Sequence, residues 1–301
     1  MDDTAILKSY KITQPELLGK GAQSRTYDYT DHEVVRIIDK TSIELTQRLK
    51  NFYDKVNSKA HVSFSLPKIL EIKEFGEQIA VIEKKLIGQR ADRLIARLDV
   101  NDKQIALQNY INALLEIKNI EFDSEIYGEL LIENRKPITA DSWVGFLKSS
   151  VQFSYQRSLK DFEVDLPDHK AILDKYLQEL ENYEFKDHDH LVHGDYYFEN
   201  IFMTNDMKVS ALFDFSALTV YGDWRMDLGG AIDWMNQYEF IDTKDYEFTR
   251  DYLKEKLGNS VSEQDLRLYK IFYSFRFSDC KQDDPKIYQW SINHLNNYLQ
   301  T

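Results

Sequence analysis

Short apolar runs broken by turn residues dominate the first part of the chain, a pattern typical of β-strands rich in β-branched and aromatic residues. Four runs cover 23–30, 33–39, 68–75 and 78–85, and a weaker one precedes Gly19. One helix is predicted between the second and third of these runs, over 42–56, because Leu49, Phe52 and Val56 recur at helical spacing. The pattern predicts a small unit of five strands and one helix.

After Gly88 the pattern changes to long helical periods. The predicted helices cover 105–120, 143–159, 170–183, 245–257 and 262–277. One β-rich island, 191–215, lies among them, and its apolar runs 200–204 and 209–215 are separated by the turn-forming pair Asn205-Asp206. We therefore predict an α+β protein with an N-terminal domain over 1–88 and a C-terminal domain over 89–301.

Composition narrows the class of protein. The 301 residues are 43% hydrophobic with one cysteine, Cys280, so we expect a folded protein without internal disulfides, as in the cytoplasm. No run approaches the roughly 18 apolar residues of a membrane span, and the opening residues lack the order of a signal peptide. We expect neither export nor membrane insertion.

Charge separates the two predicted domains. Residues 1–90 carry 15 basic and 13 acidic side chains, whereas residues 91–301 carry 23 basic and 38 acidic ones. An acidic domain repels nucleic acid and anionic lipid, but it attracts a cationic small molecule into any cleft that it lines. We therefore expect no nucleic-acid partner.

Polar residues in the β-rich island carry the candidate chemistry. His193, Asp195 and Asn200 share one loop, and Asp214 follows the next apolar run. Phosphoryl transfer needs this set, because one Asp can take the proton of an acceptor hydroxyl while an Asn and a second Asp hold Mg²⁺ on nucleotide phosphates. Asp195 is the predicted catalytic base, and Asn200 and Asp214 are the predicted metal ligands.

This loop resembles the H-x-D-x-x-x-x-N catalytic loop of the kinase fold, in the form used by aminoglycoside phosphotransferases and related small-molecule kinases. The resemblance implies a two-lobed protein-kinase-like fold, with a small antiparallel-sheet nucleotide lobe and a larger, mainly helical lobe. It implies ATP or GTP as donor and Mg²⁺ as cofactor. His193 would support the loop conformation, and Asp227 would buttress the loop. The order of motifs is most similar to that of hygromycin B phosphotransferases.

The resemblance also assigns a nucleotide site. Its glycine loop would be Gly19 to Ser24, including Gly21, and its phosphate-clamping cation would be Arg36, where the family pattern has lysine. The acidic partner of Arg36 is expected on the following helix, with Glu44 as first choice and Asp54 as alternative. The hinge that bonds the base would contain three residues: Glu83, Lys85 and Leu86.

The acceptor site is expected after the metal motif, where Asp233 and Glu239 are the candidate ligands of a small, cationic, hydroxyl-bearing molecule such as an aminoglycoside. An antibiotic-resistance enzyme, as a monomer or homodimer, fits this pattern. Choline-, macrolide- and amino-sugar-like acceptors stay open.

Two alternatives come from other classes of protein. The three His and two Asp of residues 187–193 are typical of a metallohydrolase, although we favour His188 and His190 as solvated residues. Arg36, and Ser216 where glycine is usual, would suit a nucleotide-binding protein without catalysis.

Overall fold

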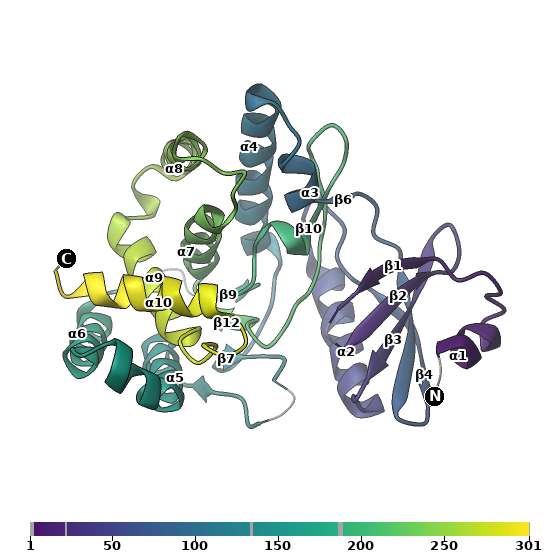
Figure 1. Cartoon of the computed structure of the whole chain (residues 1–301), viewed down its shortest axis with the longest axis horizontal. Coiled ribbons are helices and arrows are strands. Elements are labelled where there is room, and N and C mark those ends of the chain that lie inside the picture. Colours follow the sequence, from purple (N-terminus) through teal and green to yellow (C-terminus); the bar gives the residue numbers. More distant parts are fainter. Residues whose placement is uncertain (1–2, 22, 133–134, 186–188, 301) are drawn as a thin grey trace.

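The computed structural model describes residues 3–21, 23–132, 135–185 and 189–300. Figure 1 shows two lobes, a sheet-based lobe built by the first part of the chain and a larger helical lobe built by the rest. The predicted α+β, kinase-like architecture is thereby confirmed. No helix among the described residues is long and apolar enough to cross a membrane.

A five-stranded antiparallel sheet forms the small lobe, in the order β1-β2-β3-β5-β4. The strands are β1 (Leu17–Lys20), β2 (Ser24–Asp28), β3 (Glu33–Asp39), β4 (Ile69–Phe75) and β5 (Gln78–Lys84). Alternation along β3 separates the faces, because Val35 and Ile37 pack in a cluster with Ile6 and Leu7 while Arg36 points to the other face. All five predicted strands are present.

Two helices cover this sheet. The helix α1 (Asp3–Ser9) was not predicted, and it is held by Arg25, which pairs with Asp3 and Asp39 at 2.5 Å each. The helix α2 (Ile43–Lys59) was predicted, and it begins where the Ser42 hydroxyl accepts the backbone N–H of Leu45. It buries its apolar side against the face of the sheet that carries Arg36.

Eight helices build the large lobe among the described residues. They are α3 (Ala91–Ile95), α4 (Val100–Glu116), α5 (Trp143–Asp165), α6 (His169–Asn182), α7 (Arg225–Trp234), α8 (Thr243–Leu257), α9 (Glu263–Arg276) and α10 (Pro285–Tyr298). Four short 3₁₀ turns accompany them: η1 (Ile117–Asn119), η2 (Phe198–Asn200), η3 (Met235–Gln237) and η4 (Gly258–Ser260). The five predicted helices are present, whereas α3, α7 and α10 were not predicted.

Two small sheets in the large lobe hold the predicted catalytic loop. One has the order β11-β10-β6 and the other β8-β7-β12-β9. Their strands are β6 (Gln89–Arg90), β7 (Tyr127–Glu129), β8 (Thr139–Ala140), β9 (His190–Val192), β10 (Ile201–Met203), β11 (Val209–Leu212) and β12 (Val220–Gly222). The predicted hairpin is β10–β11. Because β6 pairs with β10, we propose to keep the lobe boundary at residue 88.

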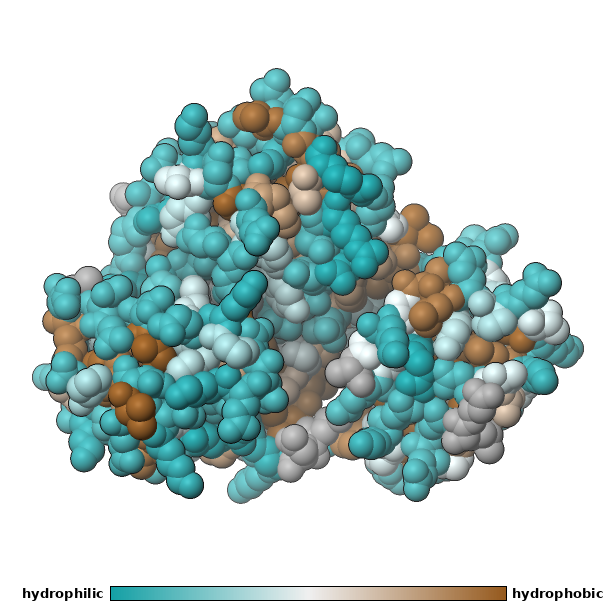
Figure 2. Space-filling view, viewed as in Figure 1, coloured by the Kyte–Doolittle hydropathy of each residue, from teal (hydrophilic) through white to brown (hydrophobic). Residues whose placement is uncertain are grey.

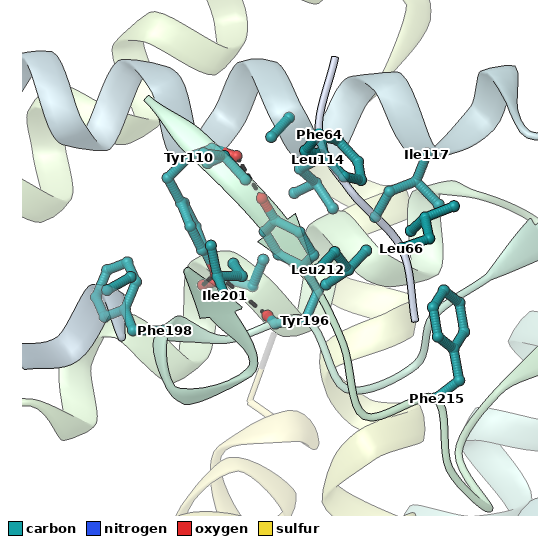
Figure 3. Packing of buried hydrophobic residues seen from close by; sticks show 14 of the residues in the cluster. Phe64, Leu66, Tyr110, Leu114, Ile117, Tyr196, Phe198, Ile201, Leu212 and Phe215 are labelled. Carbon is teal, nitrogen blue, oxygen red and sulfur yellow. Dashed lines mark hydrogen bonds between the residues drawn. The ribbon is translucent and has the colours of Figure 1, made fainter. Parts of the chain in front are cut away.

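The core beside this loop is aromatic and well bonded (Figure 3). The Tyr196 hydroxyl donates to the Tyr110 carbonyl at 2.7 Å, and the Tyr110 hydroxyl donates to the Tyr196 carbonyl at 3.2 Å. Phe198 packs on the Tyr110 ring with 4.7 Å between centroids. Helix α4 thus packs against the catalytic loop through Tyr110 and holds it in place.

Candidate active site

Asp195 and Asn200 lie side by side on the loop between β9 and β10. The amide of Asn200 donates to the backbone carbonyl of Asp195 at 2.9 Å and to its carboxylate at 3.2 Å. Partial burial, and then the charge of Asp214, raise the pKa of Asp195 to about 7. A carboxylate with a pKa near neutrality suits a general base, since it both accepts and releases a proton.

His193 is fully buried and fixes the loop rather than reacting. Its Nδ1 accepts the backbone N–H of Asp195 at 3.3 Å, so Nε2 carries the hydrogen and donates to the carbonyl of Phe213 at 3.0 Å. Burial lowers its pKa to about 4, which keeps the ring neutral. His193 therefore ties the catalytic loop to the metal motif, as the resemblance implied.

Asp227 buttresses the loop from α7. Its carboxylate accepts the backbone N–H groups of His193 at 2.8 Å and Gly194 at 2.7 Å, which confirms the predicted contact. Burial raises the pKa of Asp227 to about 7. Gly194 has φ +80°, and a Cβ there would lie 2.0 Å from the carbonyl oxygen of Leu218, so only glycine fits.

Asp214 presents its carboxylate at the surface between the lobes. Its φ of +66° is uncommon for a residue with a side chain. The next residue, Phe215, is buried against Phe52 and Tyr53 of α2, with ring centroids 5.5 and 6.2 Å apart. This packing anchors the backbone that aims Asp214, and partial desolvation raises its pKa while Arg36 opposes that effect.

The structure corrects the partner of Arg36. Nε and Nη2 of Arg36 donate to the carboxylate of Glu83 at 3.1 and 2.6 Å, whereas neither helix candidate contacts it. Glu44 lies at the start of α2, where Ser42 bonds its carboxylate, and Asp54 pairs with Lys50. The register of the sheet explains this pairing, because it makes Arg36 and Glu83 diagonal neighbours on one face of β3 and β5.

The buried ring of Tyr53 belongs to the same group, although only its place in α2 could have indicated this. Burial, with the charges of Glu83 and Asp214, raises the pKa of Tyr53, while the charge of Arg36 lowers it. The sheet lobe and the metal motif thus meet electrostatically at Arg36, Asp214 and Tyr53.

The glycine loop and the hinge lie at the predicted places, with roles that stay predictions. Gly21 donates its N–H to the carbonyl of Ser24 at 2.9 Å, and Gly19 lies in exposed β1; Ala22 lies outside the described residues. In the predicted hinge, the Glu83 carboxylate accepts hydrogen bonds from Arg36. The Lys85 N–H donates to the carbonyl of His32, so it is already used, and Leu86 is half-buried.

A cleft of about 390 Å³ opens between the lobes beside Asp214. Gln23 of the glycine loop, helix α2 and the segment 214–217 line it. Figure 2 shows a recess between the two lobes in this view. The cleft therefore joins the predicted phosphate-covering loop to the predicted metal ligand.

The two candidate acceptor residues lie in different surroundings, and their role stays a prediction. Asp233 is buried and pairs with Lys270 at 2.7 Å, and Glu239 is exposed in the turn before α8. Asp233 lies six residues after Asp227 on α7 and so lies on a different face of that helix.

Trp234 lies seven residues after Asp227 and shares its face of α7. Its ring lies 6.0 Å from that of Tyr197 in the catalytic loop and 4.9 Å from that of Tyr273. The Tyr273 hydroxyl donates to the carbonyl of Gly194 at 3.2 Å. The contact of Trp234 with the catalytic loop was not predicted, although the seven-residue spacing from Asp227 could have indicated it.

The predicted metal ligands suit magnesium better than zinc. Asn200 and Asp214 offer hard oxygen ligands, which suit Mg²⁺ held jointly with phosphates. Within the part of the chain that the structure describes, no three His, Cys, Asp or Glu side chains gather as a metal site. His190 bonds the carbonyl of Lys118 at 3.3 Å, and His188 lies outside the described residues. The metallohydrolase alternative therefore has no three-residue metal site among the described residues, which exclude Asp187 and His188.

Comparison with protein families gives one match over most of the chain. The model of the phosphotransferase enzyme family, APH, matches residues 15–256. A comparison with curated protein sequences finds no match.

Solved structures share the fold at low sequence identity. The complex of APH(2'')-IIa with streptomycin and ATP aligns with a TM-score of 0.64 and 17% identity, over 99% of this chain and 95% of that chain. Aminoglycoside phosphotransferase APH(2'')-Ib with ADP gives 0.65 and 16%, over 98% and 96%. A candidate fructosamine-3-kinase from Haemophilus somnus 129PT gives 0.65 and 12%, over 95% and 91%.

Proposed function

Because this chain belongs to the phosphotransferase enzyme family, we propose that it transfers the γ-phosphoryl group of ATP or GTP to a hydroxyl group of a small cationic acceptor. The observation that carries the proposal is the loop in which the Asp195 carboxylate lies beside Asn200 and within electrostatic reach of Asp214. Asp195 takes the acceptor proton as the new O–P bond forms, and the nucleoside diphosphate leaves as the bond to its β-phosphate breaks.

The other residues hold the reactants in this proposal. Asn200 and Asp214 would hold Mg²⁺, which when bound neutralises phosphate charge. Arg36, fixed by Glu83, would clamp the inner phosphates, and the loop from Gly19 to Ser24 would cover them. We place the reaction in the cytoplasm, since the one cysteine, Cys280, forms no internal disulfide.

We propose an aminoglycoside-like acceptor, which would make the chain an antibiotic-resistance enzyme. The net charge of −15 over residues 91–301 favours a cation, and Glu199 is a carboxylate within electrostatic reach of Asp195. Aminoglycoside phosphotransferases of the same fold have been solved as complexes with streptomycin, gentamicin or kanamycin. A second candidate is an amino-sugar metabolite, because another structure of this fold is named for fructosamine.

The test is Mg²⁺-dependent phosphate transfer from ATP and from GTP to hygromycin B, other aminoglycosides, fructosamine, a macrolide and choline. Acceptor-stimulated release of nucleoside diphosphate, with the phosphorylated product seen by mass spectrometry, is the expected result. The Asp195→Ala variant is the blank for contaminating kinases. Transfer to choline or the macrolide alone would contradict the acceptor, and no transfer to any acceptor would contradict the function.

A further inference from the structure

Helix α2 carries an arginine for which the catalytic scheme has no role. Arg48 lines the cleft of about 390 Å³ together with Leu45 and Leu49, and Asp214 and Ser216 line the same cleft. Arg48 is exposed, and it makes no ion pair or side-chain hydrogen bond within the described residues. A positive charge is thus available on the wall that α2 contributes.

The other long polar side chains around Arg48 on α2 are bonded along the helix. Lys50 pairs with Asp54 at 2.6 Å, and Gln47 donates to Asn51 at 2.9 Å. These i, i+4 contacts hold their side chains on the helix surface. Arg48 differs from both, because it lines the cleft and keeps its donors for a ligand there.

The positive charge of Arg48 would offset negative charge in the cleft. Arg36 is already paired with Glu83 at 2.6 Å, although its charge still opposes the rise in the pKa of Asp214. A nucleoside triphosphate adds several more negative charges at this place. One further cation on the wall of the same cleft reduces the repulsion between the carboxylates and the terminal phosphate.

The position of Arg48 in the cleft indicates which phosphate of the nucleotide it would bind. Gln23 of the glycine loop and the segment 214–217, which holds the predicted metal ligand, line the same cleft as Arg48. Arg36 lies on β3 and is not among the residues that line this cleft, whereas Arg48 lies on α2 and lines it. The terminal phosphate is the part of the nucleotide that lies next to the metal and the acceptor.

We propose that Arg48 binds the terminal phosphate of the nucleoside triphosphate, an inference that rests on the proposed function. A planar guanidinium can donate two parallel hydrogen bonds to phosphate oxygens, which a lysine cannot reproduce. Arg48 would thereby distinguish a triphosphate from a diphosphate. It would also help release the nucleotide product, since the diphosphate lacks the group that Arg48 holds.

The experiment compares two nucleotides and needs no knowledge of the acceptor. Isothermal titration calorimetry with Mg²⁺ measures the affinity of a non-hydrolysable ATP analogue and of ADP. For Arg48→Ala we expect about tenfold or more weaker binding of the triphosphate analogue and less than about twofold change for ADP. Arg48→Lys should fall between the wild type and Arg48→Ala, because the charge stays while the fork is lost.

The matched control is Lys50→Ala, which removes a cation from the same helix outside the cleft and should leave both affinities unchanged. Equal losses for the two nucleotides, or no loss for either, would overturn the assignment of Arg48. Wild-type protein that binds neither ATP analogue nor GTP analogue would instead overturn the proposed function itself. The two failures are therefore distinguishable.

Discussion

The catalytic loop and the cleft face of the sheet lobe differ in how fully their polar side chains are hydrogen-bonded. In the loop, His193 and Asp227 make hydrogen bonds to fixed backbone groups, and both are buried. In the sheet lobe, Arg36 has one partner, Glu83, and Arg48 is exposed without one among the described residues. The hydrogen bonds that hold the catalytic loop are thus in place before any ligand binds. In the sheet lobe, by contrast, hydrogen-bond donors stay available to bind a nucleotide.

Asp195→Ala should give the largest effect, because it removes the proton acceptor and leaves the phosphate end intact. We expect turnover to fall by about 10² to 10⁴ while nucleotide affinity stays within about twofold. Steady-state kinetics with the acceptor found in the screen and calorimetry with an ATP analogue measure the two quantities. Parallel loss of turnover and nucleotide affinity would mean that the loop and the phosphate end are not separable.

Asp227→Ala should destabilise the fold through the loop. The change leaves the backbone N–H groups of His193 and Gly194 buried without an acceptor, which costs about 2 to 4 kcal/mol. Urea unfolding measures the loss. The control is Asp206→Ala, which removes an exposed pair with Lys208 on the β10–β11 turn and should not move the midpoint. Equal stability of Asp227→Ala and wild type would show that the loop needs no buttress.

The catalytic loop was predictable because its geometry is local. His193, Asp195 and Asn200 are close in sequence, and the apolar strands on either side fix their directions. Runs of β-branched and aromatic residues between turn residues likewise predicted the five strands of the small lobe. Helix α7 was missed because nearly every position is buried, so no polar face marks its period.

Contacts between distant segments were not predictable. The pairing of Arg36 with Glu83 depends on the register of β3 and β5, which the sequence of either strand does not specify. The pairing of Asp233 with Lys270 likewise depends on how α7 packs against α9, which the sequence does not specify. Once Asp227 is placed, the position of Trp234 follows from helical geometry.

Arg36→Ala should weaken nucleotide binding without unfolding the protein. The change removes a cation from the predicted nucleotide site and leaves the Glu83 carboxylate without its partner, so we expect about tenfold or more loss of affinity for ADP and ATP analogues alike. Equal losses would contrast with Arg48→Ala, for which the loss should be specific to the triphosphate. The double variant Arg36→Ala, Glu83→Gln should recover part of the affinity, because the unpaired carboxylate is removed as well. Failure of any recovery would show that Glu83 acts only by fixing the arginine.

The titration of Asp195 should show the smallest effect and tests how the two regions are coupled. Because burial and the Asp214 charge raise its pKa to about 7, the carboxyl holds its proton below neutral pH and becomes a base only as the pH rises through that value. Carbon NMR of the labelled carboxyl in the free protein should give a midpoint near pH 7, and kcat/KM should rise over the same range. In Asp214→Asn the midpoint should move to lower pH by about one unit or less, since the largest of the charges that raise the pKa is removed while burial, Asp227 and Glu199 stay. An unchanged midpoint would show that the charge of Asp214 does not raise the pKa of Asp195, and it would separate the base electrostatically from the predicted metal ligand.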